Sequence, residues 1–255
     1  MSFKSKLLAG AATLALVGGV GTAGALSAGA ATPSCGPSCF DLFSRDFGTH
    51  HSPNFVVDVF RQGAKVGQPI ILFKTSNSDP AEDFTVSFQG RTSDFFAAGL
   101  VSSAVNLHYG GGAPSQCIGD PTGAACDDPA FEQEYAPFGV DSGLCVGLAT
   151  TAINGEGLTL QPCGVSSKTV WIWDVGNNAD DPAALAQGYF PLINGSDTNF
   201  SHPFVMTYPK NGYPTDRPRP QIRVNNLTGF SNGFGPIVGS VNSNQLWSFI
   251  FGVLK

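Results

Sequence analysis

Short apolar runs alternate with turn residues along most of the chain after residue 40, and no stretch has the spacing of a long amphipathic helix. The runs are rich in β-branched and aromatic residues and are bounded by Gly, Pro, Asn and Asp, which is typical of short β-strands. The expected strands are 54–60, 68–74, 84–88, 143–150, 157–161, 169–175, 204–208, 221–224 and 245–251. Helical turns are expected only around 94–100 and 182–187. The pattern therefore predicts an all-β protein.

The nine runs form three units that share one order: strand, turn, strand, loop and an aromatic-rich strand. The last strands of the units contain Phe84, Trp171 and Trp247. A recurring order of elements indicates an internal repeat, with chance similarity between short apolar strands as the competing explanation. Residues 89–135 and 176–200 are looser and are interpreted as insertions or long connections.

The composition agrees with a turn-rich β protein. Charged residues make up 13% of the chain, against about 25% in an average soluble protein. Gly and Pro number 32 and 18, and the hydrophobic fraction of 42% is enough for one sizeable core. These values exclude a charge-rich disordered chain and a coiled coil.

The N-terminus has the layout of a secretory signal peptide. Lys4 and Lys6 precede an uncharged apolar stretch, 7–26, and small residues follow at 27–30. We expect cleavage near Ala30, so that residues 31–255 form a single mature domain that is secreted or associated with the cell surface. A retained membrane anchor is the alternative, but glycines dilute the apolar stretch and no basic cluster follows it.

The charge balance of the mature chain bears on its partners. Removal of residues 1–30 leaves 11 basic and 19 acidic residues. Such a surface repels phosphate backbones and anionic lipids, and no stripe of Lys and Arg overrides this repulsion. We therefore expect no nucleic-acid partner and no membrane insertion after signal cleavage.

All six cysteines lie after residue 30. An even number in an exported chain indicates disulfides, although six cysteines allow 15 pairings. We expect each cysteine to pair with its nearest neighbour, as Cys35–Cys39, Cys117–Cys126 and Cys145–Cys163. A metal site is the alternative, but no histidine lies at zinc-ligand spacing from any pair. We expect no metal and no cofactor.

Several short motifs recur in the three units. Unit three ends in Asn244-Gln245-Leu246-Trp247, and unit one ends in the degenerate form Glu82-Asp83-Phe84. Unit two carries the fullest set, namely Leu144-Cys145-Val146, Asn154-Gly155, Leu158, Leu160, Pro162-Cys163 and Trp171 or Trp173. In this order the motifs resemble the ricin B-type lectin family, whose repeats end in Gln-x-Trp.

The resemblance implies a β-trefoil, an all-β fold of three repeats. The repeats would lie at about 40–88, 136–175 and 189–252, with connections at 89–135 and 176–188. Phe84, Trp171 and Trp247 would then be related by a pseudo-threefold axis and would close one shared hydrophobic core. A structural role for these three residues is expected in place of ligand contact.

The resemblance also implies where a sugar would bind. A pocket of this family combines a carboxylate after the first strand, an aromatic ring on the second, and amides before the final Trp. Unit one has Asp58 and Phe73, with Ala81 and Glu82 in place of the amides. Unit three keeps Asn244 and Gln245 but has Thr207 at the carboxylate position, and unit two has Gly147 there and Gln161 at the ring position. The best candidate site is therefore in unit one, where a turn-capping role for Asp58 is the alternative.

Catalytic motifs are absent from the sequence. The four histidines, His50, His51, His108 and His202, match no metal or triad spacing. Glu132 and Glu134 would lie on one strand face, as in a glycosidase, but a solvated strand explains such a pair equally well. No catalytic residue is expected.

Two functions remain open at this stage. The first is a secreted, non-catalytic lectin-like protein that binds an extracellular glycan or polysaccharide. The second is a structural or protein-interaction β-trefoil scaffold whose sugar sites have decayed. The incomplete pockets favour the second almost as strongly as the family resemblance favours the first.

Overall fold

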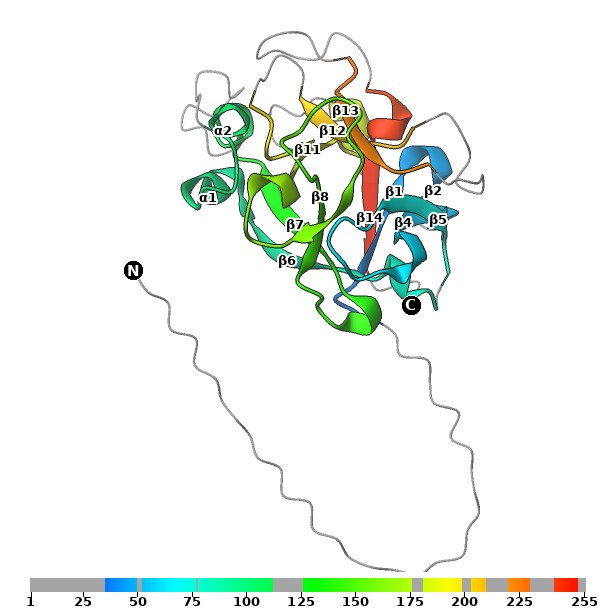
Figure 1. Cartoon of the computed structure of the whole chain (residues 1–255). Coiled ribbons are helices and arrows are strands. Elements are labelled where there is room, and N and C mark those ends of the chain that lie inside the picture. The colour runs from blue at the N-terminus through cyan, green and yellow to red at the C-terminus, as the bar shows by residue number, and fades with distance from the viewer. Residues whose placement is uncertain are drawn as a thin grey trace, which may run out of the picture. The chain divides into compact units, whose positions relative to one another are not determined.

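The computed structural model describes residues 35–49, 52–76, 78–111, 126–175, 181–198, 203–209, 220–229 and 241–251 (Figure 1). The predicted signal peptide lies outside these ranges, as do Cys117 and three of the four histidines, His50, His51 and His202. Among the residues that the structure describes, no helix is long and apolar enough to cross a membrane.

Twelve of the described strands form three sets of four. The first set is β1 (Phe40–Ser44), β4 (Phe55–Val59), β5 (Ile70–Lys74) and β6 (Phe84–Arg91). The second is β7 (Pro129–Tyr135), β8 (Leu144–Gly147), β9 (Thr159–Pro162) and β10 (Val170–Trp173). The third is β11 (Leu192–Asn194), β12 (Phe204–Thr207), β13 (Arg223–Asn226) and β14 (Trp247–Phe251). Two further short strands, β2 (Gly48–Thr49) and β3 (Ser52–Pro53), pair with each other.

The first and last strands of the three sets close into a six-stranded barrel. Antiparallel pairs run from β14 to β1, β6, β7, β10 and β11. Phe190, just before β11, completes the circle, because it exchanges two backbone hydrogen bonds of 3.0 Å with Trp247 of β14. A closed barrel leaves each repeat's long strands paired on both sides for at least part of their length.

The middle strands of each set form a hairpin, and the three hairpins β4–β5, β8–β9 and β12–β13 cap one end of the barrel. A ring of three backbone hydrogen bonds joins them. Ile70 N–H donates to the carbonyl of Leu158 (3.0 Å), Leu158 N–H to that of Ile222 (2.7 Å), and Ile222 N–H to that of Ile70 (2.9 Å). A six-stranded barrel capped by a hairpin triplet is a β-trefoil, which confirms the predicted fold class.

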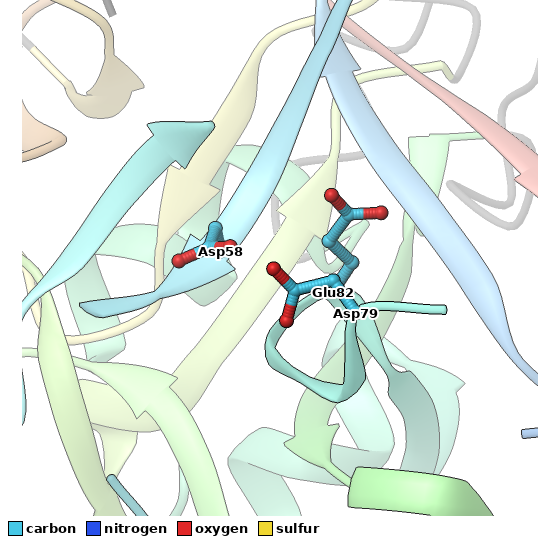
Figure 2. Close-up of side chains that lie close together, drawn as sticks. All are labelled: Asp58, Asp79 and Glu82. Carbon is cyan, nitrogen blue, oxygen red and sulfur yellow. The ribbon is translucent and has the colours of Figure 1, made fainter. Parts of the chain in front are cut away.

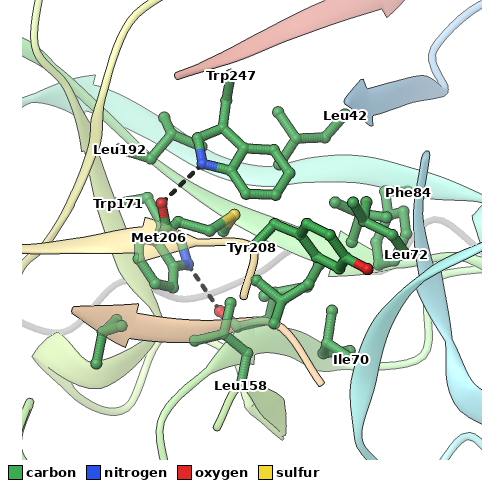
Figure 3. Close-up of a cluster of buried hydrophobic side chains, with 14 of the residues drawn as sticks. Leu42, Ile70, Leu72, Phe84, Leu158, Trp171, Leu192, Met206, Tyr208 and Trp247 are labelled. Atoms are coloured by element: carbon green, nitrogen blue, oxygen red, sulfur yellow. Dashed lines mark hydrogen bonds between the residues drawn. The ribbon is translucent and has the colours of Figure 1, made fainter. Parts of the chain in front are cut away.

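The terminal aromatic residues lie where the resemblance implied. Phe84, Trp171 and Trp247 are fully buried in one hydrophobic cluster between the barrel and the hairpins (Figure 3). Both indoles also donate hydrogen bonds to hairpin carbonyls, Trp171 to Val146 (2.9 Å) and Trp247 to Met206 (2.8 Å). These bonds fasten the hairpins of repeats two and three to the barrel, whereas Phe84 in repeat one contributes packing alone.

Each repeat contains one strand that the sequence pattern did not predict, namely its first. β1 is buried at every position, β7 lies within the stretch interpreted as a connection, and β11 has only three residues. The helical turns expected near 94–100 and 182–187 correspond to α1 (Thr92–Ala97) and α3 (Pro182–Leu185), while α2 (Ser103–Tyr109) was not expected. α1 and α2 belong to the insertion between β6 and β7.

Two of the three predicted disulfides are confirmed, Cys35–Cys39 and Cys145–Cys163. Cys126 is also disulfide-bonded, and its predicted partner Cys117 lies outside the described residues. The Cys145–Cys163 bridge links the two strands of the β8–β9 hairpin region, and its sulfur atoms come from residues 18 apart.

Replacing Cys145 and Cys163 together by Ser should lower the free energy of unfolding by about 3 kcal/mol, because this bridge restricts the longer loop in the unfolded chain. The matched variant replaces Cys35 and Cys39, four residues apart, and should cost about 2 kcal/mol. Urea denaturation followed by circular dichroism measures both values. A larger loss for the Cys35–Cys39 pair would contradict the loop-length argument.

Candidate functional site

Strand register identifies the equivalent positions of the three repeats. Val57, Val146 and Met206 occupy corresponding places in the hairpins, opposite Leu72, Leu160 and Val224 respectively. The next residue in each repeat is the predicted carboxylate position. It is Asp58 in repeat one, Gly147 in repeat two and Thr207 in repeat three, the residues that the family resemblance implied.

Repeat two has no room for a carboxylate at this position. A Cβ atom on Gly147 would lie 2.8 Å from the backbone oxygen of Lys168 and 2.8 Å from Cγ2 of Thr169. Any side chain there would therefore displace the neighbouring backbone. The glycine reflects close approach of two chain segments, so this repeat lacks the site for a structural reason.

Repeat one brings Asp58 and Phe73 to the same face of the β4–β5 hairpin. Val57 and Leu72 point into the core, so Asp58 and Phe73, each one residue further along, point away from it. Asp58 pairs with Ile71, which places Phe73 diagonally across from it. Asp58 is 3% exposed, and Phe73 is half-buried.

Two further carboxylates meet Asp58 (Figure 2). Asp79 immediately precedes the short helical turn Pro80–Glu82, and Glu82 ends it. One oxygen from each of the three carboxylates lies within 4.8 Å of the others. Asp79 is half-buried, while Glu82 is fully buried. The structure thus brings together the predicted residues Asp58 and Glu82 and adds Asp79, which the sequence analysis did not single out.

Each carboxylate on the turn also has a structural partner. Asp79 begins the turn by accepting a hydrogen bond from Ala81 N–H (3.0 Å), and it accepts another from the side-chain amide of Gln62 (3.0 Å). Glu82 accepts the N–H of Ser76 at 3.0 Å. The sequence signal that could have revealed Asp79 is Asp-Pro, since Asp is a preferred N-cap and Pro a preferred first helical residue.

Chemically, this acidic group offers only oxygen ligands. Three carboxylates at this separation form the kind of donor set that Ca²⁺ accepts in proteins. The same oxygens can accept hydrogen bonds from the hydroxyl groups of a sugar. The half-buried ring of Phe73 beside them supplies an apolar surface of the kind that covers a sugar's C–H face.

The charges of these carboxylates act on the hydroxyl of Tyr135, a buried residue of the core. Burial, as the largest cause, together with the charges of Asp83, Asp58 and Asp79 raises the pKa of the Tyr135 hydroxyl to about 12. The ring itself packs 6.0 Å from that of Phe84. Negative charge is therefore concentrated on this side of repeat one.

The other predicted binding residues, Asn244 and Gln245, lie in repeat three and do not join this group. Gln245 is buried, and its carbonyl accepts the N–H (2.9 Å) and hydroxyl (2.8 Å) of Thr228. Its amide nitrogen donates to Asn226 O (2.8 Å) and to the hydroxyl of Thr207 (3.2 Å). Asn244 donates to Tyr208 O (2.6 Å). These bonds tie the β12–β13 hairpin to the barrel.

Comparison of the repeats explains what Gln245 and Glu82 have in common. Ile70, Leu158 and Ile222 form the ring of backbone hydrogen bonds that joins the hairpins. Six positions after each of them comes an equivalent backbone N–H, which belongs to Ser76, Gly164 and Thr228 respectively. In each repeat a side-chain oxygen accepts it. The acceptors are Glu82 in repeat one, Gln245 in repeat three and, in repeat two, Glu132 from the adjacent strand β7 (2.9 Å).

Glu132 and Glu134, the pair that a glycosidase could use, both accept hydrogen bonds from other parts of the chain. Glu132 accepts the N–H of Gly164 and the hydroxyl of Thr169 (2.6 Å), and Glu134 accepts the N–H of Gly143 (2.6 Å). Burial raises the pKa of Glu134, the Gly143 bond lowers it, and the charges of Asp141 and Glu132 raise it. Both side chains are buried and hold loops in place.

Comparison with known proteins gives only distant matches. No family model matches the chain, and no curated protein does. Among solved structures it is similar to the designed threefold-symmetric protein ThreeFoil, with a TM-score of 0.48 and 11% identity over 84% of this chain and 98% of that one. The Rhizoctonia solani agglutinin gives 0.44 and 16%, and a proteinase inhibitor from Coprinopsis cinerea gives 0.42 and 13%, each over 84% of this chain and 96% of theirs. At these values the fold assignment depends on the strand pairing described above.

Proposed function

We propose that the protein is a secreted, non-catalytic carbohydrate-binding protein and that repeat one holds its binding site. The observation that carries the proposal is the meeting of Asp58, Asp79 and Glu82 on the outer side of the β4–β5 hairpin, next to Phe73. Hydrogen-bond acceptors beside an aromatic ring are the elements that recognise the hydroxyl groups and the apolar face of a sugar.

The other repeats offer less support for binding. Gly147 replaces the acid in repeat two, and in repeat three Thr207 and Gln245 bond to each other (3.2 Å). Within repeat one, Asp79 and Phe73 are partly exposed, whereas Asp58 and Glu82 are buried. A sugar would therefore reach Asp79 and Phe73 directly. Export through the predicted signal peptide is part of the proposal.

The test is a panel of immobilised oligosaccharides and soluble polysaccharides, applied to the purified protein in excess Ca²⁺ and again in EDTA. We expect at least one ligand, and we expect Asp79→Ala to weaken its binding by about tenfold or more, because it removes an acceptor that the sugar would reach. Asp58→Ala should also weaken binding, because Asp58 lies beside Asp79 and Glu82. Titration calorimetry measures the change. Glu82→Gln keeps an acceptor for Ser76 N–H, as Gln245 does in repeat three, and separates charge from structure.

The matched control is Asp141→Ala. Asp141 is an exposed acid that accepts a hydrogen bond from Thr85 (3.4 Å) outside the candidate site, so its loss should leave binding unchanged. Binding to no member of the panel would overturn the proposal and favour the alternative, a structural or protein-interaction scaffold. Equal binding by the wild type and Asp79→Ala would remove repeat one as the site.

A further inference from the structure

One position inside the barrel breaks the pseudo-threefold pattern. The first strand of each repeat has one inward residue that pairs with a residue on the last strand of a repeat. That partner lies two positions after the terminal aromatic residue, Trp247, Trp171 or Phe84. Leu42 faces Phe249, Leu192 faces Trp173, and Gln133 faces Val86. All three are fully buried. Repeat two therefore has a polar amide where the other repeats have leucine.

The amide of Gln133 points into the barrel. Phe131 and Tyr135, two residues before and after it on β7, both belong to the barrel's hydrophobic cluster, and alternate residues of a strand share a face. Within the described residues, neither Oε1 nor Nε2 of Gln133 has a hydrogen-bond partner. A buried amide without partners is strongly unfavourable, so this one needs a ligand that restores its hydrogen bonds.

A second unpaired polar atom belongs to the neighbouring strand β10. The indole Nε1 of Trp173 is buried and has no partner in the part of the chain that the structure describes. Its ring packs 5.1 Å from that of Phe131, which precedes Gln133 by two residues on the same strand face. The contrast with Trp171, whose indole N–H is bonded to Val146 O at 2.9 Å, shows that the fold pairs such groups elsewhere.

Strand β6 contributes to the same region. The register between β6 and β7 shifts between Val86 and Phe88, and Val86 is the residue directly opposite Gln133. A β-bulge places an extra residue in one strand and leaves it out of the hydrogen-bond ladder. The bulge on β6 thus lies directly beside the position that faces Gln133.

We propose that the barrel interior is a binding site for water between the amide of Gln133 and the indole N–H of Trp173. The site contains donors, Gln133 Nε2 and Trp173 Nε1, and an acceptor, Gln133 Oε1. Water accepts and donates at once and is small enough for a closed barrel, whereas an ion would lose its hydration among aromatic rings. Because Gln133 is fully buried, the surrounding side chains shield this water from solvent.

The experiment measures long-lived internal water in the folded protein by oxygen-17 magnetic relaxation dispersion, together with water-to-protein cross-peaks at the Trp173 indole and Gln133 amide protons. Two variants borrow residues that the chain already uses at equivalent positions. Gln133→Leu reproduces Leu42 and Leu192, and Trp173→Phe reproduces Phe249. We expect the wild type to show both signals and Gln133→Leu to lose the dispersion of this site.

Trp171→Phe is the control, because it removes an indole N–H that is already paired. It should keep the water signals at Gln133 and Trp173. Loss of the Gln133 cross-peak in Trp173→Phe would support a molecule shared by the two side chains. Wild-type protein without water cross-peaks at either group, or with a dispersion that Gln133→Leu leaves intact, would overturn the proposal. A bound organic solute in native mass spectra that Gln133→Leu loses would also overturn it.

Discussion

Trp247→Ala is expected to lower the free energy of unfolding by about 3–5 kcal/mol, one of the largest effects of any single change in this protein. The side chain is fully buried between barrel and hairpins, and its indole N–H holds Met206 O at 2.8 Å. The substitution removes the ring, opens a cavity and leaves a buried carbonyl without its donor. Urea denaturation followed by circular dichroism measures the change.

A second substitution separates packing from hydrogen bonding. Trp247→Phe keeps an aromatic ring, as Phe84 does in repeat one, but loses the bond to Met206, and should cost about 1–3 kcal/mol. A Phe variant as stable as the wild type would show that this bond contributes nothing to stability. An Ala variant with wild-type stability would contradict the assignment of Trp247 to the closed core.

Acidification is expected to destabilise the protein through His108. This residue of α2 is 8% exposed, and burial lowers its pKa from 6.5 to about 4. Between pH 6.5 and about 4, His108 is therefore protonated in the unfolded chain but neutral in the folded chain. The stabilisation from the neutral imidazole is complete above pH 6.5 and is lost as the pH falls toward 4. The difference in pKa corresponds to about 3 kcal/mol.

The measurement is the free energy of unfolding in urea at several pH values from about 7.5, above the pKa of the unfolded chain, down to about 4, the pKa of the folded chain. His108→Gln cannot titrate, so its stability should vary less with pH in this window than that of the wild type. Glu134 acts in the opposite sense, because its raised pKa lets the folded state bind a proton more readily. An equal slope in wild type and His108→Gln would assign the acid sensitivity to other groups.

The strands that the sequence predicted correctly are those whose burial shows in the sequence as a run of apolar residues. The second, third and fourth strands of each repeat carry runs of apolar and β-branched residues, and these runs recur in order. The first strands do not show this pattern. β7 carries three polar residues in succession, Glu132-Gln133-Glu134, and all are buried through contacts distant in sequence. No local pattern distinguishes such a strand from a solvated loop.

The candidate site was only partly predictable for a similar reason. The family resemblance implied Asp58 and Phe73, and strand alternation within one hairpin places them on the same face. Asp79 joins them because the turn Pro80–Glu82 folds back over that hairpin, which depends on tertiary structure. The internal bonding of Gln245, which uses residues from two strands and a loop, was equally hidden.

The closure of the barrel has a consequence for how the chain folds. Phe40 of the first strand pairs with Phe251 of the last, and each hairpin both donates to one neighbour and accepts from the other. No single repeat can complete its own hydrogen bonds, and the final pairing joins nearly opposite ends of the described chain. Such high contact order slows folding, because the entropy of closing long loops is lost before the contacts form. The native state is therefore reached only after the last strand has been synthesised.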